Sequence, residues 1–175
     1  LAQESLPDVA GLYIGGGFPE RFMDRLTANH SLLADLRGKI EAGLPVYAEC
    51  GGLMVLAEQI HWQGHTAAMI GALPIAVTMG ERPQGHGYMV LEGCQPDLWP
   101  GVGQRIACHE FHYSRVTRIG EGVDFAYRVV RGQGVDGRHD GLLFRHVLAS
   151  YAHIHADAAP GWAEFLAGFW RQRYC

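Results

Sequence analysis

Lysine, cysteine and long apolar runs are all scarce in this chain of 175 residues. Lys39 is the single lysine among 14 basic residues, and the formal net charge is −4. A chain without a basic excess lacks the electrostatic footprint of proteins that bind nucleic acid or lie on an anionic membrane. No apolar run reaches the length of a membrane span. The sequence therefore favours chemistry on a small molecule, with no nucleic-acid and no membrane partner.

Cysteine is also too sparse for a disulfide framework, because the chain has only four, at irregular spacing. No secretory signal is present, so we expect a reducing, cytoplasmic location. The 48% apolar content over 175 residues is enough for one core, and we expect a single domain over residues 1–175. The chain begins at Leu1 rather than Met, so we expect either an excised domain or a chain trimmed at its start.

Cys50 has the sequence context of a nucleophile. Residues 46–48 are apolar, and Glu49 and then Cys50 follow them. Gly51, Gly52 and a helical pattern begin directly after Cys50. A side chain on such a strand-to-helix turn stands clear of the sheet. The backbone N–H groups that follow it can lower a thiol pKa and bind a developing oxyanion. The alternative is a buried cysteine that only packs, which is common for free cysteine.

The first third of the chain alternates strands and helices. Residues 9–14 form an apolar strand pattern, followed by three glycines and a helix that opens with Pro19 in its first turn. Asn29 or Ser31 can cap a second helix, which Gly43 ends before the Cys50 strand. This alternation predicts βαβ units, a mostly parallel sheet flanked by helices, and a site at the carboxyl ends of its strands.

Beyond residue 71 the pattern changes to short apolar segments broken by glycines. We expect antiparallel strands there, over residues 75–79, 87–91, 105–108, 115–119 and 125–130, followed by a last strand over residues 146–154. The terminal segment has apolar residues at helical spacing and is interpreted as a helix that packs on the core, through Trp162, Phe165, Leu166, Phe169 and Trp170. The predicted fold is therefore α/β in a single domain, with an antiparallel extension.

Histidines offer both a base for a thiol and a competing metal site. Alternation places His153 and His155 on one face of the predicted last strand, and either suits a base because its pKa lies near neutrality. With His109 and His112 they could supply four imidazoles to a metal, so a His-based metal hydrolase is an alternative. Their spacing fits no common zinc signature, and we expect no metal.

The glycines at residues 15–17 might suggest a phosphate loop, but the chain contains neither GxxxxGK[ST] nor GxGxxG. We therefore do not expect a nucleotide on this chain. The two remaining interpretations of these glycines are a loop that helps to bind an oxyanion and a simple tight turn.

Five motifs occur in an order that carries a family resemblance. They are Gly15-Gly16-Gly17-Phe18-Pro19-Glu20, Tyr47-Ala48-Glu49-Cys50-Gly51-Gly52-Leu53-Met54, Arg82-Pro83-Gln84-Gly85-His86-Gly87-Tyr88, His109-Glu110-Phe111-His112-Tyr113-Ser114 and Ser150-Tyr151-Ala152-His153-Ile154-His155. Together they resemble the glutaminase domain of cobyrinic (or hydrogenobyrinic) acid a,c-diamide synthases, which is of class I glutamine amidotransferase type with a flavodoxin-like fold. The match spans about residues 8–162.

The resemblance implies that Cys50 and His153 hydrolyse glutamine, with Gly16 and Gly51 donating N–H groups to the oxyanion. The ammonia would pass to a carboxylate activated by an N-terminal ATP-dependent synthetase domain, which this chain lacks. ATP, Mg²⁺ and the corrinoid substrate would bind to that domain, and no cofactor is expected here. A non-catalytic domain that docks a partner is the alternative from a different class.

One position departs from the pattern of the class. Class I amidotransferases commonly carry a glutamate two residues after the catalytic histidine, where this chain has His155. The group that orients His153 is therefore left open between Glu49, Glu110 and a backbone carbonyl. The resemblance also suggests further residues that line or support the glutamine pocket, namely Arg82, Gln84, Glu110 and His112.

Overall fold

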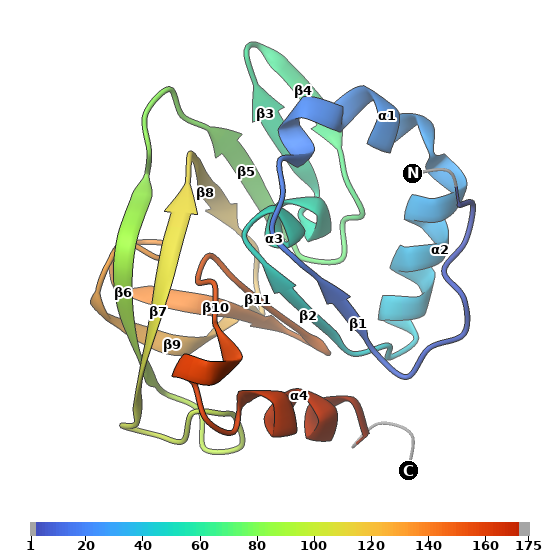
Figure 1. Ribbon diagram of the computed structural model, residues 1–175. Coiled ribbons are helices and arrows are strands. Elements are labelled where there is room, and N and C mark those ends of the chain that lie inside the picture. The colour runs from blue at the N-terminus through green and yellow to red at the C-terminus, as the bar shows by residue number, and fades with distance from the viewer. Residues whose placement is uncertain (1–2, 172–175) are drawn as a thin grey trace.

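The computed structural model describes residues 3–171, which form two sheets with helices around them (Figure 1). The larger sheet has the strand order β1-β2-β11-β10-β9-β6-β7 and the smaller one the order β4-β3-β5-β8. The strands of the larger sheet are β1 (Leu12–Ile14), β2 (Val46–Glu49), β11 (Val147–Ser150), β10 (His139–Phe144), β9 (Asp124–Arg131), β6 (Gly85–Gly93) and β7 (Arg105–His112). Those of the smaller sheet are β3 (Gln59–Trp62), β4 (His65–Ala68), β5 (Ile75–Met79) and β8 (Ser114–Ile119).

The helices lie mainly in the N-terminal third and at the C-terminal end. They are a 3-10 turn at Pro19–Phe22, α1 (Met23–Ala28), α2 (His30–Glu41), α3 (Gly51–Leu56), a second 3-10 turn at Ala156–Ala158 and α4 (Trp162–Arg171). None of the helices within residues 3–171 is long and apolar enough to cross a membrane.

The α/β class is as predicted, but the large sheet is mixed rather than mostly parallel. Only β1, β2 and β11 pair in parallel. The pairs β11–β10, β10–β9, β9–β6 and β6–β7 are antiparallel. The physical reason is the connections, because helices α1 and α2 join β1 to β2, whereas no α-helix lies between β5 and β11. Parallel pairing therefore stays at the end of the sheet that carries Cys50.

The capping residues predicted for α2 are in place. The side chain of Asn29 accepts a hydrogen bond from the N–H of Leu32 at 3.2 Å, which satisfies one of the free donors of the first turn. Gly43 follows the helix with a φ of 112°, a conformation that glycine adopts without steric cost. These two local signals fix where α2 begins and ends.

Most predicted strands are present, and three others were missed. β5 spans the predicted residues, and β6, β7, β8 and β9 extend the predicted segments. The hairpin of β3 and β4 and the strand β10 were not predicted, because each is short and β10 is interrupted by Gly141. The last strand is shorter than predicted, since β11 ends at Ser150 rather than at residue 154.

The core is divided between the two faces of the large sheet. One cluster joins Val46, Ala48 and Ala149 to residues of α2 and α3. The other joins Tyr47 and Leu148 to α4. The predicted apolar stripe of the terminal helix packs into this second cluster, through Trp162, Phe165, Leu166, Phe169 and Trp170. Because β2 is buried on both faces, the residue that follows it is held rigidly.

Candidate functional site

Cys50 occupies a strained turn between β2 and α3, as its sequence context predicted. Its φ and ψ are 47° and −100°, in a region that a residue with a Cβ rarely adopts. Such backbone strain persists only where the surrounding structure holds it, and it is concentrated at functional sites. The two glycines that follow explain the turn. A Cβ on Gly51 would lie 2.5 Å from the Gly17 carbonyl oxygen, and one on Gly52 would lie 2.2 Å from that of Ile14.

Cys50 and His153 follow neighbouring parallel strands, β2 and β11. The N–H of Cys50 donates to the carbonyl oxygen of Ser150 at 2.8 Å, which fixes the end of one strand against the other. His153 is held in turn by β7, because it exchanges backbone hydrogen bonds of 2.8 and 3.2 Å with His109. The two imidazole rings stack with their centroids 5.0 Å apart. Residues 103 positions apart thus meet at one edge of the sheet.

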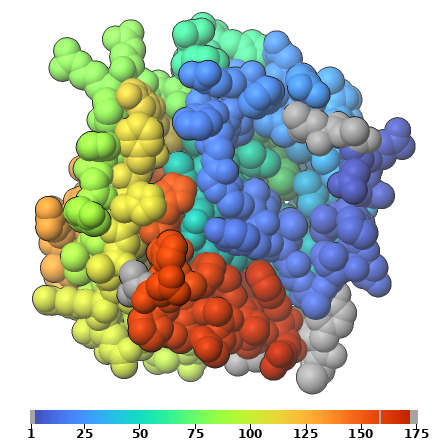
Figure 2. Space-filling view, in the orientation of Figure 1, coloured from blue at the N-terminus to red at the C-terminus, as the bar shows by residue number. Residues whose placement is uncertain are grey.

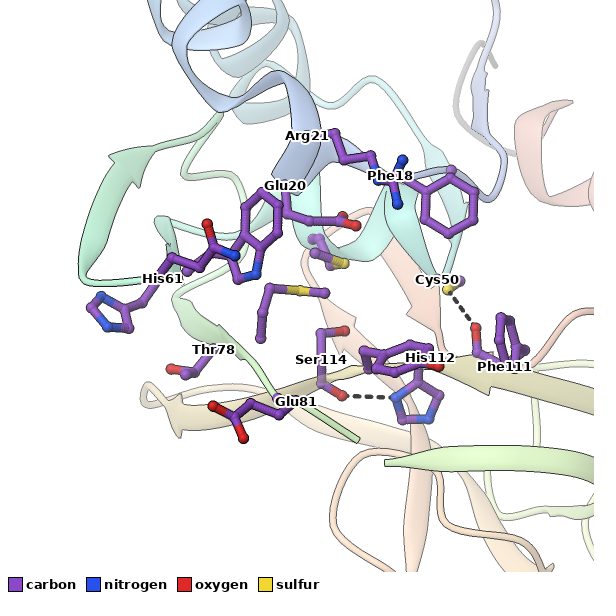
Figure 3. Close-up of a pocket in the computed structure, with 17 residues that line it drawn as sticks. Phe18, Glu20, Arg21, Cys50, His61, Thr78, Glu81, Phe111, His112 and Ser114 are labelled. Atoms are coloured by element: carbon purple, nitrogen blue, oxygen red, sulfur yellow. Dashed lines mark hydrogen bonds between the residues drawn. The ribbon is translucent and has the colours of Figure 1, made fainter. Parts of the chain in front are cut away.

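The environment of His153 favours its protonated form. Hydrogen bonds with Cys50 and Glu49 raise the pKa of His153 from 6.5 to about 9, although partial burial acts in the opposite direction. The Cys50 thiol itself lies near the carbonyl oxygen of Phe111, at an S···O distance of 3.7 Å (Figure 3). An imidazolium that remains charged above neutral pH can pair with a thiolate, which is the reactive form of cysteine.

Glu49 is the carboxylate beside His153. Its Oε2 lies 3.4 Å from Nδ1 of His153, and its side chain is only 5% exposed. Three further groups donate to the same carboxylate, namely the hydroxyls of Tyr13 at 3.0 Å and Tyr47 at 3.1 Å and the N–H of Ile154 at 3.3 Å. A buried carboxylate held by several donors is fixed in position. Of the orienting groups left open by the sequence, Glu49 is therefore the one that contacts His153.

A cavity of about 740 Å³ opens beside Cys50, within the size range of small-molecule sites. In the space-filling view it lies near the hollow between the blue N-terminal segment and the yellow β7 (Figure 2). Its lining comes from the 3-10 turn, α3, the smaller sheet and the end of β7, and includes Gly17, Phe18, Glu20, Arg21, Cys50, Met54, Trp62, Glu81, Phe111, His112, Tyr113 and Ser114 (Figure 3).

Gly51 and Gly16, the glycines predicted to form an oxyanion site, both lie at the turn from β2 to α3 that carries Cys50, which we call the elbow. Their neighbours differ. The Gly17 backbone passes directly over Gly51. Gly16 packs against the histidine ring instead, because a Cβ there would lie 2.7 Å from Cε1 of His153. Gly17, rather than Gly16, lines the cavity with Cys50. The loop of residues 15–17 therefore supports the elbow on two sides.

Glu110 and His112 are buried and bonded to one another rather than to His153. Glu110 accepts from the N–H groups of Gln133 at 2.6 Å and Gly134 at 2.9 Å, and lies 3.3 Å from Nε2 of His112. Burial raises the pKa of Glu110, but the hydrogen bonds from His112, Gly134 and Gln133 outweigh it and hold the value below its ordinary range. Glu110 thus anchors the loop after β9, whereas His112 also lines the cavity.

Three other residues that the sequence singled out lie outside the cavity. Gln84, which is half-buried, donates to the carbonyl oxygen of the exposed Arg82 at 2.9 Å. His155 points to solvent with its side chain 76% exposed, 3.8 Å from Asp157. The prediction that His153 and His155 lie on the last strand is wrong, because β11 ends at Ser150.

The four histidines considered as metal ligands do not converge. His109 and His153 stack on one another, His112 is bonded to Ser114 and Glu110, and His155 is exposed. Among residues 3–171, no three His, Cys, Asp or Glu side chains are grouped so that they could hold a metal ion.

Sequence reasoning missed the two tyrosines that hold Glu49 and the charged pair Glu20 and Arg21 in the cavity. For Tyr47 a signal was present, because it lies two positions before Glu49 and alternation places both on one face of β2. Tyr13 lies on β1, and only the pairing of β1 with β2 brings it there. Neither the sequence nor its motifs indicated that Glu20 is buried.

The fold defines a class. A solved structure described as a glutamine amidotransferase superposes with a TM-score of 0.67, at 20% identity, over 93% of this chain and 80% of its own. PurLQS from Thermotoga maritima superposes with a TM-score of 0.65, at 19% identity, over 85% of this chain and 70% of its own. At these identities the likeness concerns the fold alone, which is that of class I glutamine amidotransferases.

Sequence comparison identifies the family within that class. Residues 1–161 match the CobB/CobQ-like glutamine amidotransferase domain, and the chain belongs to this family. It is 57% identical over 173 residues to a cobyrinate a,c-diamide synthase of Magnetococcus marinus, covering 99% of this chain and 37% of the relative. A protein of the same name from Archaeoglobus fulgidus is 46% identical over 89% of this chain and 34% of the relative. The chain thus spans about a third of the length of these curated relatives.

Proposed function

We propose that this chain hydrolyses glutamine at Cys50 and supplies ammonia for the amidation of cobyrinic or hydrogenobyrinic acid at its a and c carboxylates. The observation that carries the proposal is the alignment of Cys50, His153 and Glu49 at the ends of two parallel strands. The relatives named cobyrinate a,c-diamide synthase support the acceptor substrate. An N-terminal synthetase domain would bind ATP, Mg²⁺ and the corrinoid in the part of those relatives that this chain does not span.

The first half of the reaction forms a thioester. The Cys50 thiolate, paired with the His153 imidazolium, attacks the side-chain carbonyl carbon of glutamine, and a C–S bond forms as the carbonyl electrons move to oxygen. The N–H groups of Gly51 and the loop of residues 16–17 stabilise this oxyanion. His153 gives its proton to the amide nitrogen, the C–N bond breaks and ammonia leaves.

The second half restores the enzyme. Neutral His153 takes a proton from water, and the hydroxide attacks the thioester carbon. The C–S bond then breaks, glutamate is released, and the thiolate is again paired with an imidazolium. Both halves use the same two side chains, and the complete cycle consumes one water.

Glu49 is proposed as the positioning residue for His153. A carboxylate on Nδ1 fixes the ring orientation and leaves Nε2 for the thiol and the leaving group, as in other nucleophile–histidine–carboxylate sites. Here the carboxylate comes from the residue before the nucleophile, in place of the one that the class commonly carries two residues after the histidine. The exposed side chain of His155 supports this assignment.

Labelling with a glutamine analogue tests the proposed function. The chain is exposed to 6-diazo-5-oxo-norleucine with and without excess glutamine, and the adduct is located by intact mass and peptide mapping. We expect one adduct, on Cys50, which glutamine suppresses. His153→Ala should slow labelling strongly because it removes the cationic partner of the thiolate.

The matched control is His155→Ala, which changes the same residue type two positions away on an exposed side chain. This variant should label like the parent chain. If the folded chain takes no adduct on Cys50, alone and with the synthetase part of a relative added, the glutaminase proposal is wrong.

A further inference from the structure

A buried carboxylate lies in the same cavity as the nucleophile. Glu20 is in the 3-10 turn Pro19–Phe22, which directly follows the glycine loop over the elbow, and it is only 8% exposed. Its carboxylate points into the cavity, which Cys50 also lines (Figure 3). The mechanism proposed above gives this carboxylate no task.

Glu20 has no ion-pair partner among the described residues. Its carboxylate accepts a hydrogen bond from its own backbone N–H, and within residues 3–171 no side chain forms an ion pair with it. Burial raises the pKa of Glu20, and the neighbouring Arg21 lowers it by less. A carboxylate taken out of water without a partner is costly, whereas a bound cation would offset that cost.

The positively charged side chain of Arg21 follows Glu20 in the sequence. Arg21 also lines the cavity, and its guanidinium lies 5.8 Å from the centre of the exposed Phe18 ring. No carboxylate of the described residues lies within ion-pair distance of this guanidinium. On adjacent residues, Glu20 and Arg21 therefore present a buried negative group and a positive group to whatever enters beside Cys50.

We propose that Glu20 binds the α-ammonium group and Arg21 the α-carboxylate of the glutamine whose side-chain amide reaches Cys50. The inference rests on the proposed function, and it adds the part of the site that selects a free amino acid. Two adjacent opposite charges complement a zwitterion, and a guanidinium suits carboxylate binding in particular. A primary amide without an α-ammonium group leaves Glu20 buried and unpaired, so such substrates are rejected.

The ligand side gives a test that needs no variant. Cys50 labelling by 6-diazo-5-oxo-norleucine is measured in the parent chain with glutamine or with glutaramate, which is glutamine without its α-amino group, as the protecting ligand. We expect glutamine to protect at a concentration lower by about tenfold or more, the scale of a hydrogen bond to a charged group. Equal protection by the two ligands would overturn the inference.

The protein side uses Glu20→Gln, which keeps the size of the side chain and removes its charge. The labelling rate with 6-diazo-5-oxo-norleucine should fall by about tenfold or more, and the preference for glutamine over glutaramate should disappear. The rate with iodoacetamide, which carries no α-amino acid group, should stay near that of the parent chain, because the thiol is unchanged. An unchanged rate with the glutamine analogue would overturn the inference.

Glu81→Gln is the matched control, because Glu81 lines the same cavity but is exposed. It removes one carboxylate charge from the cavity and should leave both labelling rates close to those of the parent chain. If Glu81→Gln slows the glutamine analogue as much as Glu20→Gln, general charge rather than a specific contact governs binding, and the inference is overturned.

The failures of the two proposals are distinguishable. A parent chain that iodoacetamide labels on Cys50 but the glutamine analogue does not, alone and with the synthetase part of a relative added, would overturn the proposed function, and this inference with it. A parent chain that the analogue labels, with protection by glutamine, and a Glu20→Gln variant that behaves identically would overturn only the assignment of Glu20.

Discussion

At the scale of single residues, one carboxylate connects the strand of the proposed nucleophile to the proposed base. Glu49 precedes Cys50 in the chain, receives hydrogen bonds from Tyr13 and Tyr47, and lies beside Nδ1 of His153. The same contacts change the tyrosines, because burial and the Glu49 charge raise the pKa of Tyr13 to about 12. These hydroxyls therefore stay protonated and donate to Glu49 throughout the neutral range.

The protonation of His153 should depend on Glu49. Glu49→Gln removes the negative charge and one of the two hydrogen-bonding partners that raise the pKa of His153. We expect this pKa to fall from about 9 toward its ordinary value of 6.5, as measured by NMR titration of the ring. Asp157→Asn is the control, since it removes an exposed carboxylate that lies near His155. A pKa of His153 that is equal in all three proteins would show that Glu49 does not act on the ring.

At the scale of elements, the site is made by close approach of a loop, a strand end and a short helix. Gly51 and Gly52 begin α3, and the backbone of residues 14–17 passes within the space that a Cβ would occupy at either position. The elbow therefore depends on small residues at the start of α3 and not on the stability of that helix, which has only six residues.

Gly51→Ala should disrupt the site. Its Cβ would lie 2.5 Å from the carbonyl oxygen and 2.7 Å from the nitrogen of Gly17, so the glycine loop must move away from the elbow. We expect loss of labelling by the glutamine analogue and lower thermal stability. Gly38→Ala is the matched control, because nothing lies within 4 Å of its Cβ in the middle of α2. That change should stabilise the protein by about 0.5–1 kcal/mol, since alanine favours a helix.

Thermal unfolding followed by circular dichroism, together with labelling rates, distinguishes the two variants. If Gly51→Ala labels as fast as Gly38→Ala, the close packing of Gly17 on Gly51 has no part in the reaction.

At the scale of the whole molecule, the proposed site lies where the larger sheet, the smaller sheet and the N-terminal turn meet. β2 and β11 supply Cys50 and His153, whereas the smaller sheet and the end of β7 supply much of the cavity wall. Any movement between these parts would change the site. The backbone pairing of His109, at the end of β7, with His153 joins two of these parts. The protonation of His153 should therefore affect the free energy of unfolding of the whole chain.

This coupling predicts how stability depends on pH. His153 has a folded pKa of about 9, above its ordinary value of 6.5, so its favourable contribution is complete below pH 6.5 and is lost as pH rises to about 9. The size is on the order of 3 kcal/mol at most, at 1.36 kcal/mol per pKa unit. His153→Gln should remove this part of the slope.

Urea unfolding below pH 6.5 and above pH 9 measures the effect, with the exposed His65→Gln as the control. The parent chain and His65→Gln should lose more stability across this window than His153→Gln. Equal losses in all three proteins would mean that His153 titrates near its ordinary pKa.

Much of the local organisation was predictable because its causes are local. The cap at Asn29, the stop at Gly43, the strand β5 and the turn at Cys50 each depend on a few consecutive residues. The length of β11 and the strand β10 were not predictable in the same way. Both depend on pairing with partners far along the chain, and a short segment interrupted by glycine carries too weak a pattern.

The sequence by itself determined the class of fold, the family and the strand-to-helix turn at Cys50, because these rest on ordered motifs and on local propensities. Only the tertiary structure decided which carboxylate lies at His153. Glu49 and Glu110 are both glutamates, so the sequence does not distinguish between them. Parallel pairing of β2 and β11 brings Glu49 to the imidazole of His153, whereas Glu110 is hydrogen-bonded to the loop after β9. The burial of Glu20 beside Cys50 was decided in the same way, by packing between segments that are distant in sequence.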